Sequence, residues 1–262
     1  MRLSNHHVFI TGGGSGIGLA LAREFLARSN RVTICGRTAA KLQQAAVENP
    51  GLDFIVADIS REEGLRLIAD ELSGRLGSVS ILINNAASGD AYCLRRDPDA
   101  FLRMEQELAT GLLAPMRLTK LFLPLLKGRE NPAVVNITSG YALWPCPVLP
   151  GYSVSKAGLR AFTKILRAQL RSSGIRVFEV LPPLVDTSLV SRVMQRKLTP
   201  AKVAAATLAG MANDCTEICI GEVRLLRLGK RFWPWLTDRV MMRYPIPIND
   251  LEQLYPPGDD HR

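Results

Sequence analysis

The chain contains 262 residues, of which 47% are hydrophobic and 22% are charged. This length suits one large α/β domain with a buried sheet, and no segment has the composition of a linker to a second domain. The formal net charge is +9, but no recognised nucleic-acid-binding motif accompanies the basic residues, so nucleic acid is not an expected partner.

The start of the chain and its cysteines indicate a cytoplasmic protein. The first apolar segment, residues 8–10, is too short for a signal peptide or a membrane span. The five cysteines are odd in number and scattered, which indicates reduced thiols. Cys215 and Cys219 lack the histidines or second cysteine pair that zinc needs, so no metal is expected.

Short apolar segments alternate along the chain with longer amphipathic ones, as buried strands alternate with helices in α/β folds. The expected strands are 8–10, 31–35, 54–56, 81–83, 134–137 and 177–180, and the expected helices are 17–28, 39–47, 62–76, 101–126, 153–172 and 200–212. This order predicts a single-domain Rossmann fold over residues 1–223, with a doubly wound parallel sheet and helices on both faces. A basic, aromatic extension over residues 224–262 follows it.

A glycine-rich turn from Thr11 to Gly18 follows the first expected strand. Glycines there let backbone amides approach a pyrophosphate, and the helix that begins near Ile17 directs its positive dipole end at that charge. The pattern of Gly12, Gly16 and Gly18 indicates a dinucleotide site, although such turns also arise from packing alone.

Arg37 follows the second expected strand, where an NAD-binding fold usually offers a carboxylate to the adenosine ribose. With glycine at position 36 and a guanidinium able to pair with a phosphate, NADPH or NADP+ is favoured over NADH. The alternative is a solvated arginine at the end of a strand.

Tyr152 and Lys156 are one helical turn apart, and Ser139 lies thirteen residues before the tyrosine. Reduction of a carbonyl places negative charge on its oxygen, which must be hydrogen-bonded and then protonated. Tyr152 is the natural acid, and a nearby Lys156 cation is expected to lower the pKa of its phenol. The alternative is a core tyrosine beside a lysine whose stem is buried.

Together these motifs resemble the short-chain dehydrogenase/reductase family, and the DltE-like oxidoreductase branch in particular, from about residue 5 to residue 190. The resemblance makes Ser139 the partner of the substrate carbonyl and gives Lys156 a second role on the nicotinamide ribose. It places Asp58 and Ile59 at the adenine, Asn85 and Ala86 at the adenosine ribose, and Val185 and Thr187 at the nicotinamide carboxamide. The full set of expected cofactor-binding residues is Gly12, Gly14, Ser15, Gly16, Ile17, Gly18, Arg37, Asp58, Ile59, Asn85, Ala86, Tyr152, Lys156, Pro182, Val185 and Thr187.

The sequence departs from the family pattern at three positions. Gly111 stands where most members carry an asparagine that helps hold a proton-relaying water, and Ala87 and Pro183 stand where glycines are usual. Glycine at 111 removes an amide but leaves room for water. Neither of the other changes touches the acid, so catalysis is still expected.

The segment 141–150, between Ser139 and Tyr152, is apolar, aromatic and stiffened by three prolines. It favours a hydrophobic or aromatic carbonyl substrate over a sugar, with Tyr141, Trp144 and Leu149 as expected contacts. By resemblance, a substrate loop over about 184–200 acts as a lid, whose basic residues are expected to face water.

The extension combines basic residues with Trp233 and Trp235. Such a segment could lie in a membrane interface, but packing on the domain or on a partner subunit is favoured because Pro234 interrupts a continuous amphipathic helix. The wide apolar face of the long helices 101–126 and 153–172 predicts a homodimer or homotetramer.

The sequence therefore predicts an NADPH-dependent oxidoreductase of a ketone or aldehyde, or of the corresponding alcohol. The alternative is an NADPH-binding scaffold or regulatory protein with weak or lost catalysis, because of Gly111. The identity of the substrate and the physiological direction do not follow from the residues.

Overall fold

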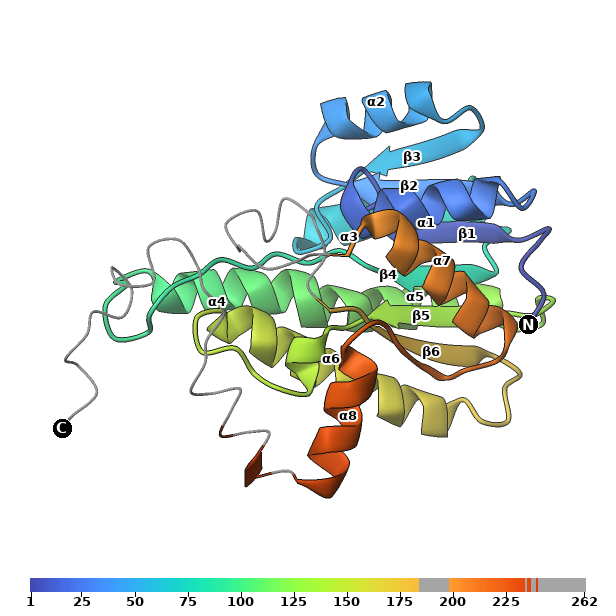
Figure 1. The fold of residues 1–262 in the computed structure, drawn as a ribbon. Coiled ribbons are helices and arrows are strands. Elements are labelled where there is room, and N and C mark those ends of the chain that lie inside the picture. Colours follow the sequence, from blue (N-terminus) through green and yellow to red (C-terminus); the bar gives the residue numbers. More distant parts are fainter. Residues whose placement is uncertain (184–197, 234, 237–238, 240–262) are drawn as a thin grey trace.

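The computed structural model describes residues 1–183, 198–233, 235–236 and 239, and a parallel sheet of seven strands lies at its centre (Figure 1). The strands stand in the order β3-β2-β1-β4-β5-β6-β7. This order reverses between β1 and β4, which creates the crevice where ligands bind in open α/β sheets. The strands are β1 (His7–Thr11), β2 (Arg31–Gly36), β3 (Leu52–Val56), β4 (Ile81–Asn84), β5 (Ala133–Ile137), β6 (Arg176–Leu181) and β7 (Glu217–Cys219).

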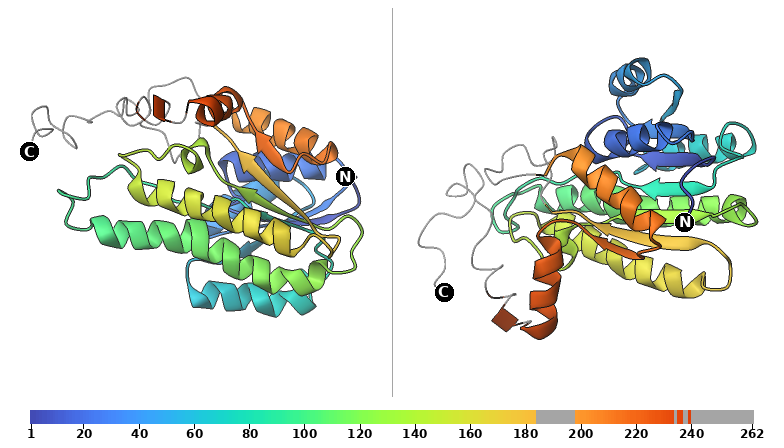
Figure 2. Two further views of the ribbon diagram at one scale, coloured as in Figure 1. Left: turned by 90° about the horizontal axis from the view of Figure 1, so that it is seen from below. Right: turned by 45° about the vertical axis from the view of Figure 1, so that its right-hand side comes forward.

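Helices cover both faces of the sheet, which confirms the expected doubly wound fold (Figure 2). On one face, apolar side chains pack from α1 (Gly16–Leu26), α2 (Ala39–Glu48) and α7 (Pro200–Ala212). On the other face they pack from α3 (Glu62–Asp70), α5 (Ala114–Leu126) and α6 (Pro150–Gln169). The strands are buried on both sides, which is why they are continuous apolar runs in the sequence.

The expected helix 101–126 is one rod divided by a π-turn. It consists of α4 (Ala100–Leu108), the turn η2 (Ala109–Leu113) and α5, and the N–H of Ala114 bonds the carbonyl of Ala109. Pro115 has no N–H to bond the carbonyl of Gly111, so the α-helical ladder is interrupted at this point. The turn places Gly111 inside the fold.

Other helices begin or end at residues different from those expected, and two elements were not expected at all. The expected helix 62–76 ends at Asp70 and continues as a short 3-10 turn, η1 (Glu71–Ser73), and α6 begins at Pro150 rather than at residue 153. Strand β7 and helix α8 (Val223–Phe232) were not predicted. A strand of three residues is too short to show a period, and the apolar residues of α8 are interspersed with arginines.

Among the described residues, no helix is both long enough and apolar enough to cross a membrane.

Candidate active site

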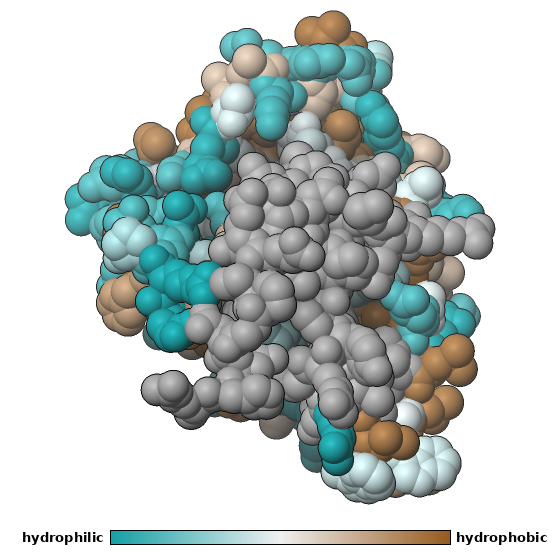
Figure 3. All heavy atoms as spheres, turned by 60° about the vertical axis from the view of Figure 1, so that its left-hand side comes forward, coloured by the Kyte–Doolittle hydropathy of each residue, from teal (hydrophilic) through white to brown (hydrophobic). Residues whose placement is uncertain are grey.

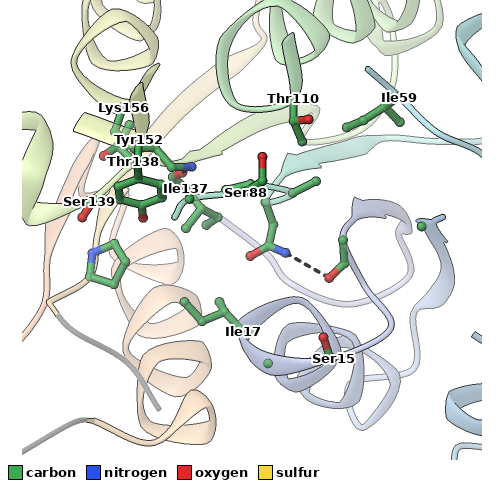
Figure 4. Close-up of a pocket in the computed structure, with 18 of the residues that line it drawn as sticks. Ser15, Ile17, Ile59, Ser88, Thr110, Ile137, Thr138, Ser139, Tyr152 and Lys156 are labelled. Atoms are coloured by element: carbon green, nitrogen blue, oxygen red, sulfur yellow. Dashed lines mark hydrogen bonds between the residues drawn. The ribbon is translucent and has the colours of Figure 1, made fainter. Parts of the chain in front are cut away.

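A cavity of about 460 Å³ opens at the carboxyl ends of the central strands (Figure 4). Its lining comes from the glycine turn after β1, the ends of β2 and β4, the segment after β5 and the first turns of α6. Figure 4 shows Ser139, Tyr152 and Lys156 at one end of this cavity and Ile59 and Thr110 at the other. The sheet topology thus joins motifs that are far apart in the sequence.

The glycine turn is fastened to β4 by Thr11 and Asn85. The Thr11 hydroxyl accepts the backbone N–H of Asn85 at 3.0 Å, and the Asn85 side-chain amide donates to the carbonyls of Thr11 at 2.9 Å and Gly12 at 3.2 Å. A Cβ atom on Gly18 would lie 2.3 Å from the Gly12 carbonyl oxygen. Glycine at 18 is therefore required for α1 to begin this close to the turn.

The beginning of α1 has the properties of an anion site. Ser15, Gly16 and Ile17 line the cavity, and the first turn of α1, which is fully described, contains no acidic residue. Gly16 has a φ of +54°, a conformation that favours glycine. Backbone N–H groups at a helix N-terminus suit the pyrophosphate of a dinucleotide.

Arg37 lines the same cavity after the end of β2, next to Gly36. Its side chain is exposed, and no ion pair of Arg37 occurs among the described residues. The guanidinium is thus available to an anionic group bound in the cavity.

Three elements position the residues at the other end. Ser139 follows β5 and accepts the N–H of Tyr141 at 3.1 Å. Tyr152 lies in the first turn of α6, and Lys156 is one turn further on, with its Nζ 5.6 Å from the centre of the Tyr152 ring. The buried Lys156 ammonium donates to the carbonyl of Ile137 at 2.8 Å, which ties α6 to the end of β5.

Burial dominates the electrostatics of the tyrosine and the lysine. It raises the pKa of Tyr152 to about 12, although a hydrogen bond with the Ser139 side chain lowers it. It lowers the pKa of Lys156 to about 8. The expected lowering of the phenol pKa by Lys156 is therefore wrong for this structure, because burial is the largest influence on this pKa and the group that lowers it is Ser139. At neutral pH the phenol is therefore protonated.

A buried carboxylate supports the start of helix α6. Glu107 of α4 accepts the backbone N–H of Asp90 at 2.8 Å and the hydroxyl of Tyr92 at 3.0 Å, and the backbone N–H of Tyr152 also donates to it. Tyr92 in turn accepts the N–H of Gly151 at 3.2 Å. Negative charge at this helix N-terminus stabilises it, and the same carboxylate holds the loop after β4.

A second buried network supports the segment that carries Ser139. Arg160 of α6 forms an ion pair with the fully buried Glu179 of β6 at 2.6 Å. The hydroxyl of Thr138, the residue before Ser139, donates to the same carboxylate at 3.0 Å. Helix α6 and the end of β5 are therefore held by one charge pair.

The structure brings most of the expected residues to the cavity. The residues that line it are Gly12, Ser15, Gly16, Ile17, Arg37, Asp58, Ile59, Asn85, Ala86, Ser139, Tyr141, Tyr152, Lys156 and Pro182. Gly14 and Gly18 do not line it and instead approach Leu42 and Gly12. Val185 and Thr187 lie outside the described residues, as does most of the expected substrate loop.

Two expected substrate contacts are not brought to the cavity. Trp144 is buried with Leu181, Cys219 and Val223, and Leu149 is buried beside Val148. Sequence reasoning also missed lining residues. Ser88, Gly89 and Asp90 directly follow Asn85 and Ala86, a proximity that could have indicated them, whereas Thr110 comes from the π-turn and gave no local signal.

Comparison with known proteins gives three matches of note. The family model described as "short chain dehydrogenase" matches residues 6–198. "Uncharacterized oxidoreductase DltE" of Bacillus subtilis (strain 168) is 34% identical over 189 residues, which cover 72% of this chain and 75% of that protein. "Probable galactose dehydrogenase GalD" of Rhizobium meliloti (strain 1021) is 30% identical over 249 residues, 86% of this chain and 94% of that protein.

A solved structure has the same fold. The crystal structure of a short chain dehydrogenase from Burkholderia cenocepacia J2315 in complex with NADP aligns with a TM-score of 0.82 at 24% identity, covering 92% of this chain and 99% of the other. The arrangement of sheet and helices is thus shared over nearly the whole of both chains.

Proposed function

The chain belongs to the short-chain dehydrogenase family, and from this premise we propose that it is an NADPH-dependent oxidoreductase of a hydrophobic or aromatic ketone or aldehyde, or of the corresponding alcohol. The family resemblance inferred from the motifs is confirmed. NAD(P)-dependent chemistry between alcohol and carbonyl groups follows from family membership. NADPH preference, the substrate and the residue roles are the proposal.

The observation that carries the proposal is the arrangement of one cavity. A glycine turn and an open helix N-terminus line its cofactor side together with Arg37, while Ser139, Tyr152 and Lys156 meet at the other end. A dinucleotide fits this lining because the close approach of backbone to ligand requires the glycines that are present. When bound, the nicotinamide supplies the hydride.

The chain's own residues handle the substrate oxygen and its proton. The Ser139 hydroxyl and the Tyr152 phenol are placed to hydrogen-bond the carbonyl, and the phenol, protonated at neutral pH, donates the proton that completes the alcohol. The resulting phenolate faces the Lys156 ammonium, which opposes its negative charge. In alcohol oxidation the same proton returns to Tyr152.

Arg37 supports NADPH over NADH. The expected carboxylate for the ribose is absent after β2, where Gly36 and Arg37 line the cavity. A guanidinium without an ion-pair partner among the described residues suits the additional phosphate of NADPH.

The substrate end favours an apolar molecule. Tyr141 lines the cavity and meets the Tyr152 ring edge-on, with the ring centres 6.3 Å apart. Behind them lies a small apolar cluster that includes Cys146 and Val148. A flat hydrophobic or aromatic carbonyl compound matches these walls, and Leu149, which belongs to the same apolar cluster, supports them from behind.

Association into a homodimer or homotetramer is also part of the proposal. Apolar side chains remain exposed on the long helices: Leu113 by 45%, Met116 by 38%, Val154 by 50% and Ile165 by 55%. A second copy that covers them would bury this surface across a twofold axis. Light scattering of the purified chain tests this, and a monomer at micromolar concentration would contradict it.

The function is tested by NADPH oxidation with a panel of hydrophobic ketones, aromatic aldehydes and quinones. We expect turnover with at least one class, and Tyr152→Phe should abolish it while NADPH affinity, followed by fluorescence titration, stays nearly unchanged. Absence of turnover across the panel, together with a Tyr152→Phe variant that retains the biological effect of the wild type, would identify a cofactor-binding scaffold instead.

A further inference from the structure

Helix α8 is oriented with its apolar side away from the protein. Leu225 is 73% exposed, Leu228 54% and Phe232 63%. These three residues are spaced by three and four positions, so they form one stripe along the helix. A helix of a globular domain normally buries such a stripe against the core.

Polar contacts, in contrast, attach α8 to the domain. Arg227 forms an ion pair with Glu217 of β7 at 2.7 Å, and the Arg224 guanidinium donates to the carbonyl of Cys219 at 2.8 Å. Val223, buried beside Trp144 and Leu181, is the apolar residue that fixes the first turn. The domain therefore holds the helix by its start and its arginine side and leaves the stripe open.

The apolar stripe continues into aromatic residues and is bordered by positive charge. Trp233 is 58% exposed and Trp235 66%, and Arg231 is exposed with its guanidinium 6.0 Å from the centre of the Phe232 ring. Among the described residues from 222 to 233, Glu222 is the one acid. Hydrophobic atoms lie open at the lower edge of the molecule in Figure 3, the end at which α8 projects in Figure 1.

We propose that this stripe, formed by Leu225, Leu228, Phe232, Trp233 and Trp235, docks on the surface of an anionic lipid bilayer. An amphipathic helix with tryptophans beside its apolar side and arginines on its polar side lies in the plane of a membrane interface, and anionic headgroups complement its charge. Helix α8 has ten residues, which suits lying on a bilayer rather than crossing it.

The charge around the stripe argues against a second copy of the chain as the partner that covers it. An isologous contact brings the same patch of both copies together, so the basic border of the stripe, which includes the exposed Arg231, would lie against the basic border of the second copy, with Glu222 as the one acid among the described residues from 222 to 233. Additional positive charge lies at the exposed Lys164 of α6 and at the exposed Arg171 just after this helix, which line one pocket with Thr216, the residue before β7. This charge strengthens attraction to an anionic surface.

Docking would place the membrane near the active site. Val223 of α8 approaches Gly140, the residue after Ser139, closely enough that a Cβ atom on Gly140 would lie 3.2 Å from it. The inference itself does not depend on the proposed function, because its measurement is lipid binding and not turnover.

The test is co-sedimentation of the full chain with vesicles of phosphatidylcholine and phosphatidylglycerol in equal amounts, and with vesicles of phosphatidylcholine alone. The wild type should pellet with the anionic vesicles and be partly released by salt, because screening weakens headgroup attraction. Leu225→Glu/Phe232→Glu should lower the partition coefficient about tenfold or more, since two large apolar side chains are lost from the interface. Arg231→Gln should weaken binding to the anionic vesicles only.

The matched control is Val47→Glu/Phe101→Glu, which places the same charges at exposed apolar positions on α2 and α4. It should pellet like the wild type, and circular dichroism melting and NADPH titration should show that every variant is folded. A wild type that stays in the supernatant, or an α8 variant that pellets as well as the wild type, overturns the proposal. If the α8 variant dissociates an oligomer and still binds vesicles like the wild type, the stripe contacts a second copy of the chain. That result also overturns the proposal.

Discussion

Gly111 of the π-turn lies so close to Ser155 of the catalytic helix that a Cβ atom at position 111 would stand 2.8 Å from the Ser155 hydroxyl oxygen and 3.1 Å from its Cβ. Ser155 in turn donates to the carbonyl of Tyr152 at 2.7 Å. Glycine at 111 therefore does more than remove the amide expected from the family. It allows the π-turn to pack directly against the helix that carries Tyr152 and Lys156.

Substitution of Gly111 should destabilise the protein. The contact with Ser155 indicates that Gly111→Asn overpacks this site, and we expect a loss of about 1–3 kcal/mol in the free energy of unfolding. Ser155→Ala in the same chain should recover part of that loss, because it removes the nearer atom. Urea melts of the two single variants and the double variant measure the coupling, and strictly additive losses would disprove the contact.

Arg37→Ala should weaken NADPH binding about ten- to hundredfold, which corresponds to about 1.5–3 kcal/mol for a charge-assisted contact. NADH affinity should change little, because NADH lacks the phosphate. Fluorescence titration of both cofactors measures the two effects. Arg66→Ala, at an exposed arginine of α3, is the matched control, and equal affinities of the wild type for both cofactors would refute the assignment of Arg37.

The rate of carbonyl reduction should depend on Lys156 at alkaline pH. Burial lowers the pKa of Lys156 to about 8, so the ammonium is charged at neutral pH and loses its proton as the pH rises through that value. The pKa of Tyr152, raised to about 12, keeps the acid protonated over the same range. We expect kcat/KM at saturating NADPH to be flat near neutrality and to decline above about pH 8. If the rate does not decline at alkaline pH, the charge of Lys156 does not assist Tyr152 as the acid.

Loss of the Glu107 carboxylate should loosen the start of α6. Glu107→Ala leaves the buried Tyr92 hydroxyl and the N–H of Tyr152 without their acceptor, which costs about 1–3 kcal/mol for each unsatisfied group. Tyr92→Phe removes one donor and keeps the carboxylate, so it should cost less. Thermal melts and kcat of both variants check that Glu107→Ala has the larger effect. A Glu107→Ala variant as stable and active as Tyr92→Phe would contradict this prediction.

His7 should make the protein sensitive to acid. Burial lowers the pKa of His7 from 6.5 to about 4, while the unfolded chain takes up the proton at the ordinary value. The unfolded state therefore binds more protons between these two values, so this contribution to stability is present above pH 6.5 and is lost as the pH falls toward 4.

His7→Gln tests the origin of this loss. Glutamine can still hydrogen-bond the hydroxyls of Ser78 and Thr33, which His7 contacts at 2.8 and 2.9 Å, but it takes up no proton. The melting temperature of His7→Gln should fall less than that of the wild type between neutral and acidic pH. Parallel curves for the two proteins would exclude His7 as the sensitive group.

The sequence by itself predicted six of the seven strands, the glycine turn and the three residues Ser139, Tyr152 and Lys156 that line one cavity. Strands buried on both faces appear as continuous apolar runs, and the helices show their own period, so local pattern was sufficient to predict them. The glycine turn and the spacing from Tyr152 to Lys156 are also local, because one turn of helix sets that spacing. Arg37 was found at the cavity because the end of a strand is recognisable in the sequence.

Only the tertiary structure decided how these parts are buried and what they touch. Trp144 and Leu149 lie between Ser139 and Tyr152 in the sequence, but their side chains pack in apolar clusters away from the cavity. Thr110, in contrast, reaches the cavity from a π-turn. The pKa of Tyr152 rises instead of falling because desolvation depends on neighbours from several elements. The outward stripe of α8 likewise depends on which side β7 holds by ion pairing. Burial and charge pairing arise from contacts between distant segments, and a local pattern does not contain them.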